Sequence, residues 1–353
     1  MSTRVLVVGC GGIGGVLGAS LAQMHDIDES LLARPTILAR NAALAAHVRE
    51  RGLRVLGASE ALGRPEIATS TGALSGGYDL IFLATQPPQV EAAAAEVAPL
   101  LAKDGALVCF QNGLCEERVA AAHGGDQVLG AVVSWGASVR EPGVIERTSA
   151  GGFTLGRLDG GTADPRLVTL QALLSSVGPA ELTPNLRGAR WSKLAINAAI
   201  SSLGTVGGDR LGALMRHRFI RRLALEIMSE VVAVAEAEGV RLEKVSGTLD
   251  LPWLALTDAE RAGKSPGGLV AKHAVLLAVG TRYRKLRSSM LSAIERGREP
   301  AVDFLNGEVA DRGARHGIAT PVNTATRQLV HAVARGEQQS SLSTARTLMD
   351  AIS

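Results

Sequence analysis

The first half of the chain alternates short apolar runs with helical patterns of apolar residues. The runs of strand length are residues 36–40, 53–57, 79–85 and 105–113, and the helical patterns between them are residues 41–51 and 87–101. Strands that alternate with helices at this spacing are typical of a parallel sheet covered by helices on both faces. We therefore expect an α/β domain in this half.

The second half has a different pattern. Strand-like runs disappear, and long amphipathic helical patterns follow, for example at residues 216–239 and 287–316. The segment LTPNLRG, residues 182–188, supplies the proline, asparagine and glycine of a linker. Because 353 residues exceed the usual size of a single core, the sequence predicts two domains, an α/β domain of residues 1–184 and an all-α domain of residues 185–353.

A glycine motif follows the first apolar run. After VLVV, the glycines Gly9, Gly11 and Gly14 have the spacing GxGxxG and open a helical pattern. This context predicts a Rossmann-type dinucleotide-binding domain, in which the first glycine allows a tight turn, the second lets a pyrophosphate approach, and the third permits close packing. We assign Gly9, Gly11, Gly12, Ile13 and Gly14 to the cofactor site. The alternative is a glycine-rich turn without a ligand.

The end of the second predicted strand bears on the choice of cofactor. An NAD-preferring site places an aspartate or glutamate there to bind the ribose hydroxyl groups, whereas this chain has Arg40 followed by Asn41. A guanidinium suits a 2′-phosphate instead. The prediction is therefore NADP, with a solvated loop arginine as the alternative.

Composition argues against several classes of protein. The formal net charge is only +3, and the arginines are scattered, so we predict no nucleic-acid partner. No run of 18 or more apolar residues and no signal-peptide pattern are present, so we expect no membrane partner and a cytoplasmic location. The three cysteines and seven histidines lack metal-ligand spacing, and we predict no metal site.

A polar row interrupts the helical pattern that begins at Trp191. Lys193, Asn197 and Ser201 recur at i, i+4 and i+8 and therefore share one face of the expected helix. A buried, unpaired ammonium would cost several kcal/mol, so Lys193 must reach solvent, find a carboxylate or face a polar cleft. A lysine whose stem follows the helix surface to solvent is the simpler interpretation.

Several separate motifs then indicate a family. They are GCGGIGG near the N-terminus, FQNGL at 110–114, PGVI at 142–145, WSKLAINA at 191–198, SSML at 288–291, DFLNG at 303–307 and RHGIATPVN at 315–323. With these motifs in this order, the chain resembles the ketopantoate reductase family, the 2-dehydropantoate 2-reductases. The resemblance implies a dinucleotide-binding domain followed by an all-helical domain, and NADPH as the hydride donor to the ketone of a small 2-oxo acid. We add a homodimer as a candidate assembly.

The resemblance also implies roles for four residues. Lys193 matches the general acid, and Asn197 matches an asparagine that contacts and positions the substrate. Asn112 matches an asparagine near the nicotinamide, and Ser289 matches a serine that contacts the substrate carboxylate. Hydride addition to a ketone develops negative charge on oxygen, which an adjacent ammonium stabilises and protonates.

Three positions depart from the family pattern. Ser201 replaces a second asparagine, and Gln86 replaces a lysine that holds the adenosine phosphate, so we retain Gln86 as a candidate cofactor contact. Ala301 replaces a glutamate that helps bind substrate, and the nearby Glu299 is a less favoured substitute for it. Two further alternatives stay open, namely a reductase of a different small ketone or imine and a non-catalytic NADP sensor. Residues 240–287 form an extra lid or a surface excursion.

Overall fold

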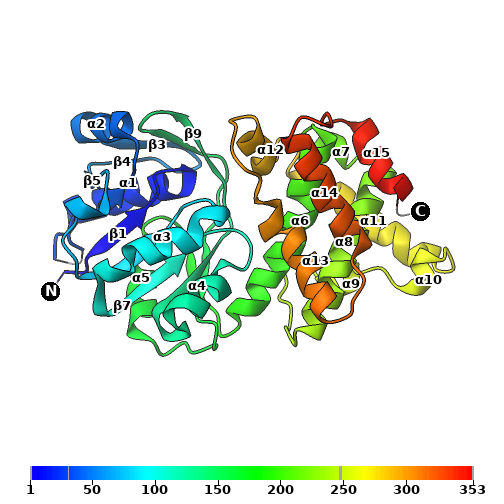
Figure 1. The fold of residues 1–353 in the computed structure, drawn as a ribbon, viewed down its shortest axis with the longest axis horizontal. Coiled ribbons are helices and arrows are strands. Elements are labelled where there is room, and N and C mark those ends of the chain that lie inside the picture. Colours follow the sequence, from blue (N-terminus) through cyan, green and yellow to red (C-terminus); the bar gives the residue numbers. More distant parts are fainter. Residues whose placement is uncertain (1, 31, 246–248, 352–353) are drawn as a thin grey trace. The chain divides into compact units, whose positions relative to one another are not determined.

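The computed structural model describes residues 2–30, 32–245 and 249–351. The chain divides into two compact units (Figure 1). Unit 1 comprises Met1–Gln111 and Cys115–Leu186, and unit 2 comprises Asn112–Leu114 and Arg187–Ser353. The division coincides with the start of helix α6, Leu186–Gly207, two residues after the boundary that we expected from the linker segment.

The main sheet of unit 1 has eight strands in the described part of the chain, in the order β12-β11-β8-β7-β6-β1-β2-β5. The strands are β1 (Val5–Val8), β2 (Thr36–Leu38), β5 (Glu66–Ala68), β6 (Tyr78–Leu83), β7 (Leu101–Cys109), β8 (Val128–Val133), β11 (Phe153–Gly156) and β12 (Ala180–Leu182). Neighbouring strands are parallel except for β8 and β11, which are antiparallel. The interior strand β1, between β6 and β2, is buried along its whole length, as in a sheet covered on both faces.

Helices connect these strands. They are α1 (Gly12–Ile27), α2 (Ala42–Arg51), α3 (Val90–Val97), α4 (Cys115–His123) and α5 (Pro165–Ser175). The helix that we expected over residues 87–101 is shorter, because 3-10 turns flank α3 where prolines occur at Pro87 and Pro99. The α/β, Rossmann-type architecture predicted for the first half of the chain is confirmed.

A second, smaller sheet in unit 1 was not expected. Its order is β4-β3-β10-β9, with β3 (Leu53–Gly57), β4 (Ala61–Gly63), β9 (Ala137–Glu141) and β10 (Val144–Arg147). The run at 53–57 was thus wrongly assigned to the parallel sheet. Its pattern gives the physical reason, since Leu53 and Val55 are buried while Arg54 is exposed, as in a sheet with one open face.

The named elements of unit 2 are helices, which confirms the predicted all-α second half. After α6 they are α7 (Leu211–Leu214), α8 (Arg218–Ala237), α9 (Leu251–Leu254), α10 (Asp258–Arg261), α11 (Pro266–Arg282), α12 (Ser289–Ile294), α13 (Asn306–Arg315), α14 (Pro321–Ala334) and α15 (Leu342–Ala351), with a 3-10 turn η5 (Ala301–Phe304) before α13. The expected helix at 216–239 corresponds to α8. The expected single helix at 287–316 is wrong: Gly297, with φ of 68°, and Pro300 end α12 and separate it from α13.

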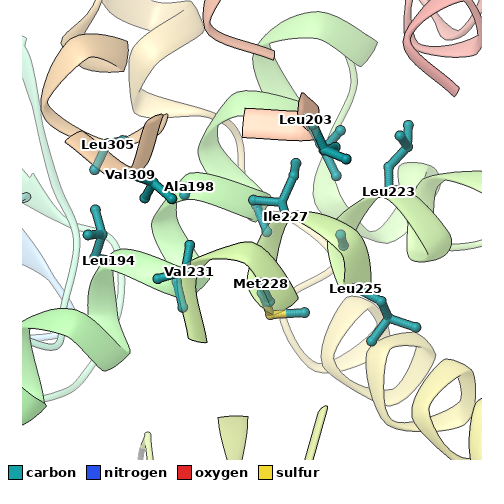
Figure 2. Packing of buried hydrophobic residues seen from close by; sticks show 14 of the residues in the cluster. Leu194, Ala198, Leu203, Leu223, Leu225, Ile227, Met228, Val231, Leu305 and Val309 are labelled. Atoms are coloured by element: carbon teal, nitrogen blue, oxygen red, sulfur yellow. The ribbon is translucent and has the colours of Figure 1, made fainter. Parts of the chain in front are cut away.

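Aliphatic side chains from α6, α8 and α13 are part of the hydrophobic core of unit 2 (Figure 2). Leu194 and Ala198 of α6 pack in the same cluster as Val231 of α8 and Val309 of α13. Because Leu194 and Ala198 face inward, the residues just before each of them, Lys193 and Asn197, lie at the edge of this core and are half-buried. The apolar cluster thereby fixes which face of α6 carries the polar row.

Candidate active site

The predicted site residues fall into two sets, one in each unit. Unit 1 holds the glycine loop, Arg40 and Gln86, and unit 2 holds Asn112, Lys193, Asn197 and Ser289. The loop follows β1, and the amide of Gly9 donates a 2.9 Å hydrogen bond to the carbonyl of Leu38 at the end of β2. Gly9 has φ of 99°, a conformation that L side chains rarely adopt. The carboxyl ends of β1 and β2 therefore meet at this loop.

The other glycines of the loop differ in the space around them. A Cβ atom on Gly14 would lie 1.9 Å from the carbonyl oxygen of Gly9, and one on Gly12 would lie 2.5 Å from the oxygen of Ala137. Neither position has room for a side chain. A Cβ atom on Gly11 would meet nothing within 4 Å, so the one open position of the motif is the glycine that we expect beside a pyrophosphate.

The start of α1 offers backbone donors. The N-cap residue is Gly11, so no side chain occupies the amide donors at the helix start. The first turn, which includes the half-buried Ile13, contains no acidic residue. Burial raises the pKa of the Cys10 thiol to about 11, so the loop also brings no thiolate. Amide donors at a helix N-terminus suit an anion, and the residues present thus fit a dinucleotide pyrophosphate.

Arg40 lies exposed just after β2. Its guanidinium forms an ion pair with Glu96 of α3, a residue that the sequence analysis did not single out. Asn41 caps α2 instead, since its side-chain oxygen accepts a hydrogen bond from the amide of Leu44 at 2.9 Å. The carboxyl edge of β2 therefore carries a paired arginine and a helix N-terminus.

Two further cofactor candidates follow neighbouring strands. Gln86 is exposed at the start of the 3-10 turn after β6. Asn112, half-buried, follows β7, and the next residue, Gly113, has φ of 89°. A Cβ atom on Gly113 would lie 2.5 Å from the carbonyl oxygen of Phe304, so this turn packs directly against η5 within unit 2.

The polar face of α6 holds an available donor. Lys193 and Asn197 are one turn apart and half-buried. The amide nitrogen Nδ2 of Asn197 is buried and has no hydrogen-bond partner among the described residues. A buried donor without an acceptor costs about 1–3 kcal/mol, so such a group is expected where a ligand supplies the acceptor.

Ser289 is brought to α6 by its neighbour. Ser288 is buried, caps α12 by accepting from the amide of Leu291, and donates a 2.8 Å hydrogen bond to the carbonyl of Ser201. Thr205 Oγ1 donates to the same carbonyl at 2.9 Å. The first turn of α12, with Ser289 exposed in it, is thus attached to α6 one turn after Asn197.

A buried polar network supports this face, and its members had no predicted role. Asn306 donates to the carbonyl of Ala198 at 3.2 Å and accepts from Ser202 Oγ at 2.5 Å. It also donates to Asn323 Oδ1 at 2.9 Å, and Asn323 in turn donates to Glu230 at 2.7 Å. Burial raises the pKa of Glu230, although backbone amides at the start of α14 donate to it. The network joins α6, α8, α13 and α14.

Ala301 and Glu299 lie on the segment between α12 and α13. Ala301 is half-buried in η5, and Glu299 is exposed before it. In the same turn Asp303 accepts hydrogen bonds from Arg327 at 2.5 Å and from His331 at 3.1 Å. Burial acts against ionisation of this carboxyl, yet His331 and Arg327 hold its pKa below the ordinary value.

The described part of segment 240–287 is fastened to the rest of unit 2. Arg261 Nε donates to Glu226 of α8 at 2.9 Å. Within the segment, Lys272 and Glu260 form a buried ion pair at 2.5 Å. Ser229 Oγ of α8 accepts from the amide of Leu256 at 2.7 Å. These anchors favour a fixed surface excursion over a lid.

Among the described residues, no group of three or more histidine, cysteine, aspartate or glutamate side chains could hold a metal ion. In the same residues, no helix combines the length and apolar character needed to cross a membrane.

Comparison with known proteins decides the family. The protein-family model for ketopantoate reductase PanE/ApbA matches residues 5–160. The family model for the C-terminal part of ketopantoate reductase PanE/ApbA matches residues 185–334. The chain belongs to the ketopantoate reductase family. It is therefore an oxidoreductase of the type that acts on CH–OH groups.

Two ketopantoate reductases and a D-mandelate dehydrogenase are similar to this chain over nearly its whole length. The 2-dehydropantoate 2-reductase of Halobacterium salinarum is 29% identical over 337 residues, which span 94% of this chain and 99% of that protein. The PanE/ApbA family ketopantoate reductase from Ralstonia eutropha JMP134 matches with a TM-score of 0.75 and 23% identity, covering 96% of this chain and 100% of that one. The structure of D-mandelate dehydrogenase with NADH and anilino(oxo)acetate matches with a TM-score of 0.76 and 20% identity. The match covers 95% of this chain and 99% of that one. At these identities the two structures establish the fold.

Proposed function

We propose that the chain reduces a small 2-oxo acid to the 2-hydroxy acid with NADPH as hydride donor. The observation that carries this proposal is the α6 face, where Lys193 lies one turn from the buried and unpartnered Asn197 amide. Relatives named 2-dehydropantoate 2-reductase support the reaction class.

The residues of unit 1 fit a nicotinamide dinucleotide. The amides at the start of α1 would hold the pyrophosphate beside Gly11, and Arg40 would hold a 2′-phosphate. Gln86 and Asn112 are further candidate contacts, because both follow strands at the carboxyl edge of the sheet. When bound, the reduced cofactor supplies the hydride.

The residues of unit 2 would handle the oxygen of the substrate. As the hydride reaches carbon 2, the carbonyl π-electron pair moves onto oxygen, and Lys193 Nζ both stabilises this charge and gives it a proton. Asn197 Nδ2 would donate a hydrogen bond to the substrate and so position its ketone beside Lys193. The Ser289 hydroxyl, carried on the anchored start of α12, would bind the carboxylate. Lys193 then regains its proton from water.

Ala301 supports a substrate other than ketopantoate. A glutamate at this position would hydrogen-bond a polar substituent, whereas a half-buried alanine leaves an apolar corner. An apolar pocket discriminates by only about 1–3 kcal/mol per methylene, so we propose a broad preference for apolar 2-oxo acids or aryl ketones.

The test follows NADPH oxidation by absorbance with ketopantoate, an apolar branched 2-oxo acid and an aryl 2-oxo acid. Turnover that depends on the added oxo acid, with NADPH alone as the blank, supports the proposal. If NADPH binds but no oxo acid or small ketone is reduced, the chain is a non-catalytic sensor and the proposal is wrong.

We also propose a homodimer in solution. Val270 and Leu277, two turns apart on α11, are 63% and 41% exposed, and such an apolar helix face suits a second copy. Sedimentation at several protein concentrations measures the mass, and a monomer throughout would contradict this assembly.

A further inference from the structure

Arg40, which we expect to bind the 2′-phosphate of NADPH, already has an acidic partner in the structure. Its side chain is 78% exposed and ion-paired to Glu96, whose own side chain is 32% exposed. The pair brings a carboxylate from α3 to the guanidinium that we expect to bind the 2′-phosphate of NADP.

Glu96 is the more firmly placed member of the pair. It lies on α3, whose Val90, Ala94 and Val97 are buried in unit 1. Its second carboxylate oxygen lies 3.5 Å from the hydroxyl of Thr71, in the turn after β5. Since β5 pairs with β2, Thr71 and Arg40 follow neighbouring strands, and the Glu96 carboxylate contacts both residues at this edge of the sheet.

We propose that Glu96 is a specificity-determining residue, which competes with the 2′-phosphate of NADPH for Arg40 and so reduces the preference for NADPH over NADH. A 2′-phosphate carries nearly two negative charges, and it must share the guanidinium with Glu96 or displace that carboxylate. NADH has only hydroxyl groups there and meets no such repulsion. This inference rests on the proposed use of NADPH.

The experiment measures cofactor affinity rather than turnover. Dissociation constants for NADPH, NADH, 2′,5′-ADP and 5′-AMP are determined by fluorescence or calorimetry at low salt for the unmodified chain, Glu96→Gln and Arg40→Ala. Glu91→Gln is the matched control, because Glu91 lies on the same helix and its carboxylate is 3.6 Å from a different arginine, Arg118. The fragments isolate the adenosine end of the cofactor.

Glu96→Gln is expected to tighten NADPH and 2′,5′-ADP by about fivefold, the range of an exposed ion pair, and to leave NADH and 5′-AMP unchanged. Added salt should shrink the effect, since exposed charges are screened. Unchanged or weaker NADPH binding in Glu96→Gln, or an equal gain for NADH, overturns the inference.

Arg40→Ala separates this inference from the proposed cofactor. If Arg40→Ala loses the preference for 2′,5′-ADP while Glu96→Gln has no effect, NADPH use stands and the role of Glu96 is wrong. If neither the unmodified chain nor Glu96→Gln prefers the 2′-phosphate, the NADPH proposal itself fails.

Discussion

The glycine loop of unit 1 and the polar face of α6 in unit 2 are built in opposite ways. In the loop, Gly12 and Gly14 are required because backbone oxygens lie within 2.5 Å of where a Cβ atom would be. On α6, side chains matter, and the helix that carries them is held by Asn306 and Ser288 from segments about a hundred residues away. The loop depends on close approach of backbone, by Gly9 within the motif and by Ala137 of β9, whereas the α6 face depends on buried polar contacts between side chains of distant elements.

This difference predicts how each region fails. A side chain added to the loop should disturb packing at once, except at Gly11, where space is open. Removal of a polar side chain behind α6 should leave several buried donors and acceptors unsatisfied, and these are costly away from water.

The largest effect is expected for Gly14→Ala, whose Cβ atom would clash with the oxygen of Gly9. Severe overpacking against backbone costs about 3 kcal/mol or more in the free energy of unfolding. Gly11→Ala should leave stability nearly unchanged but weaken NADPH binding. Chemical denaturation and cofactor titration of both variants measure this, and equal stability losses would contradict the distinction between the two glycines.

Asn306→Ala comes next. It removes hydrogen bonds to Ala198, Ser202 and Asn323, all in the buried network, and should lower the free energy of unfolding by about 2–3 kcal/mol. The control is Gln328→Ala, an exposed amide on α14, which should change stability by no more than about 0.5 kcal/mol. Equal denaturation midpoints for the two variants would show that the network does not hold α6.

Buried polar groups should also make unit 2 sensitive to acid. Burial, and then the charges of Arg221, Arg218 and Arg222, lower the pKa of His273 to about 4 from 6.5. The unfolded chain therefore takes up this proton first, so stability should fall by about 2 kcal/mol as the pH drops from 6.5 to 4. Chemical denaturation between pH 6.5 and 4 should show that the free energy of unfolding depends less on pH in His273→Gln than in the unmodified chain. An equal pH dependence in both would contradict the assigned role of His273.

Ala301→Glu tests the apolar corner. Restoring a carboxylate should raise kcat/KM for ketopantoate relative to an apolar branched 2-oxo acid by about tenfold, the value of one good polar contact. Glu299→Gln is the companion variant and should leave kcat/KM unchanged for both substrates. Efficient ketopantoate reduction by the unmodified chain, lost in Glu299→Gln, would mean that Glu299 has taken over the role.

Local patterns allowed part of this structure to be predicted. The turn at Gly9, the close packing at Gly14 and the helix α8 follow from residues near one another in the sequence. The break in the amphipathic pattern 287–316 also has a local cause, since Gly297 and Pro300 are strong helix-ending signals.

Long-range pairing could not be predicted. Strand β3 pairs with β10, which lies about ninety residues later in the chain, and no pattern within residues 53–57 predicts that pairing. The partner of Arg40 lies on a helix whose sequence shows only an ordinary surface glutamate, Glu96. The contacts of Asn306 likewise depend on how four helices pack. The roles of Lys193, Asn197, Ser289 and Asn112 stay predictions.

Lys193 is the residue on which the proposed reaction depends most directly. The decisive measurement compares kcat at saturating NADPH, and the dissociation constant of NADPH, in Lys193→Ala and in Lys264→Ala, an exposed lysine elsewhere in unit 2. We expect Lys193→Ala to lose about 10²-fold in kcat with NADPH affinity unchanged, because a general acid acts on the substrate. An unaltered turnover rate in Lys193→Ala would make Lys193 a surface lysine and contradict the proposed mechanism.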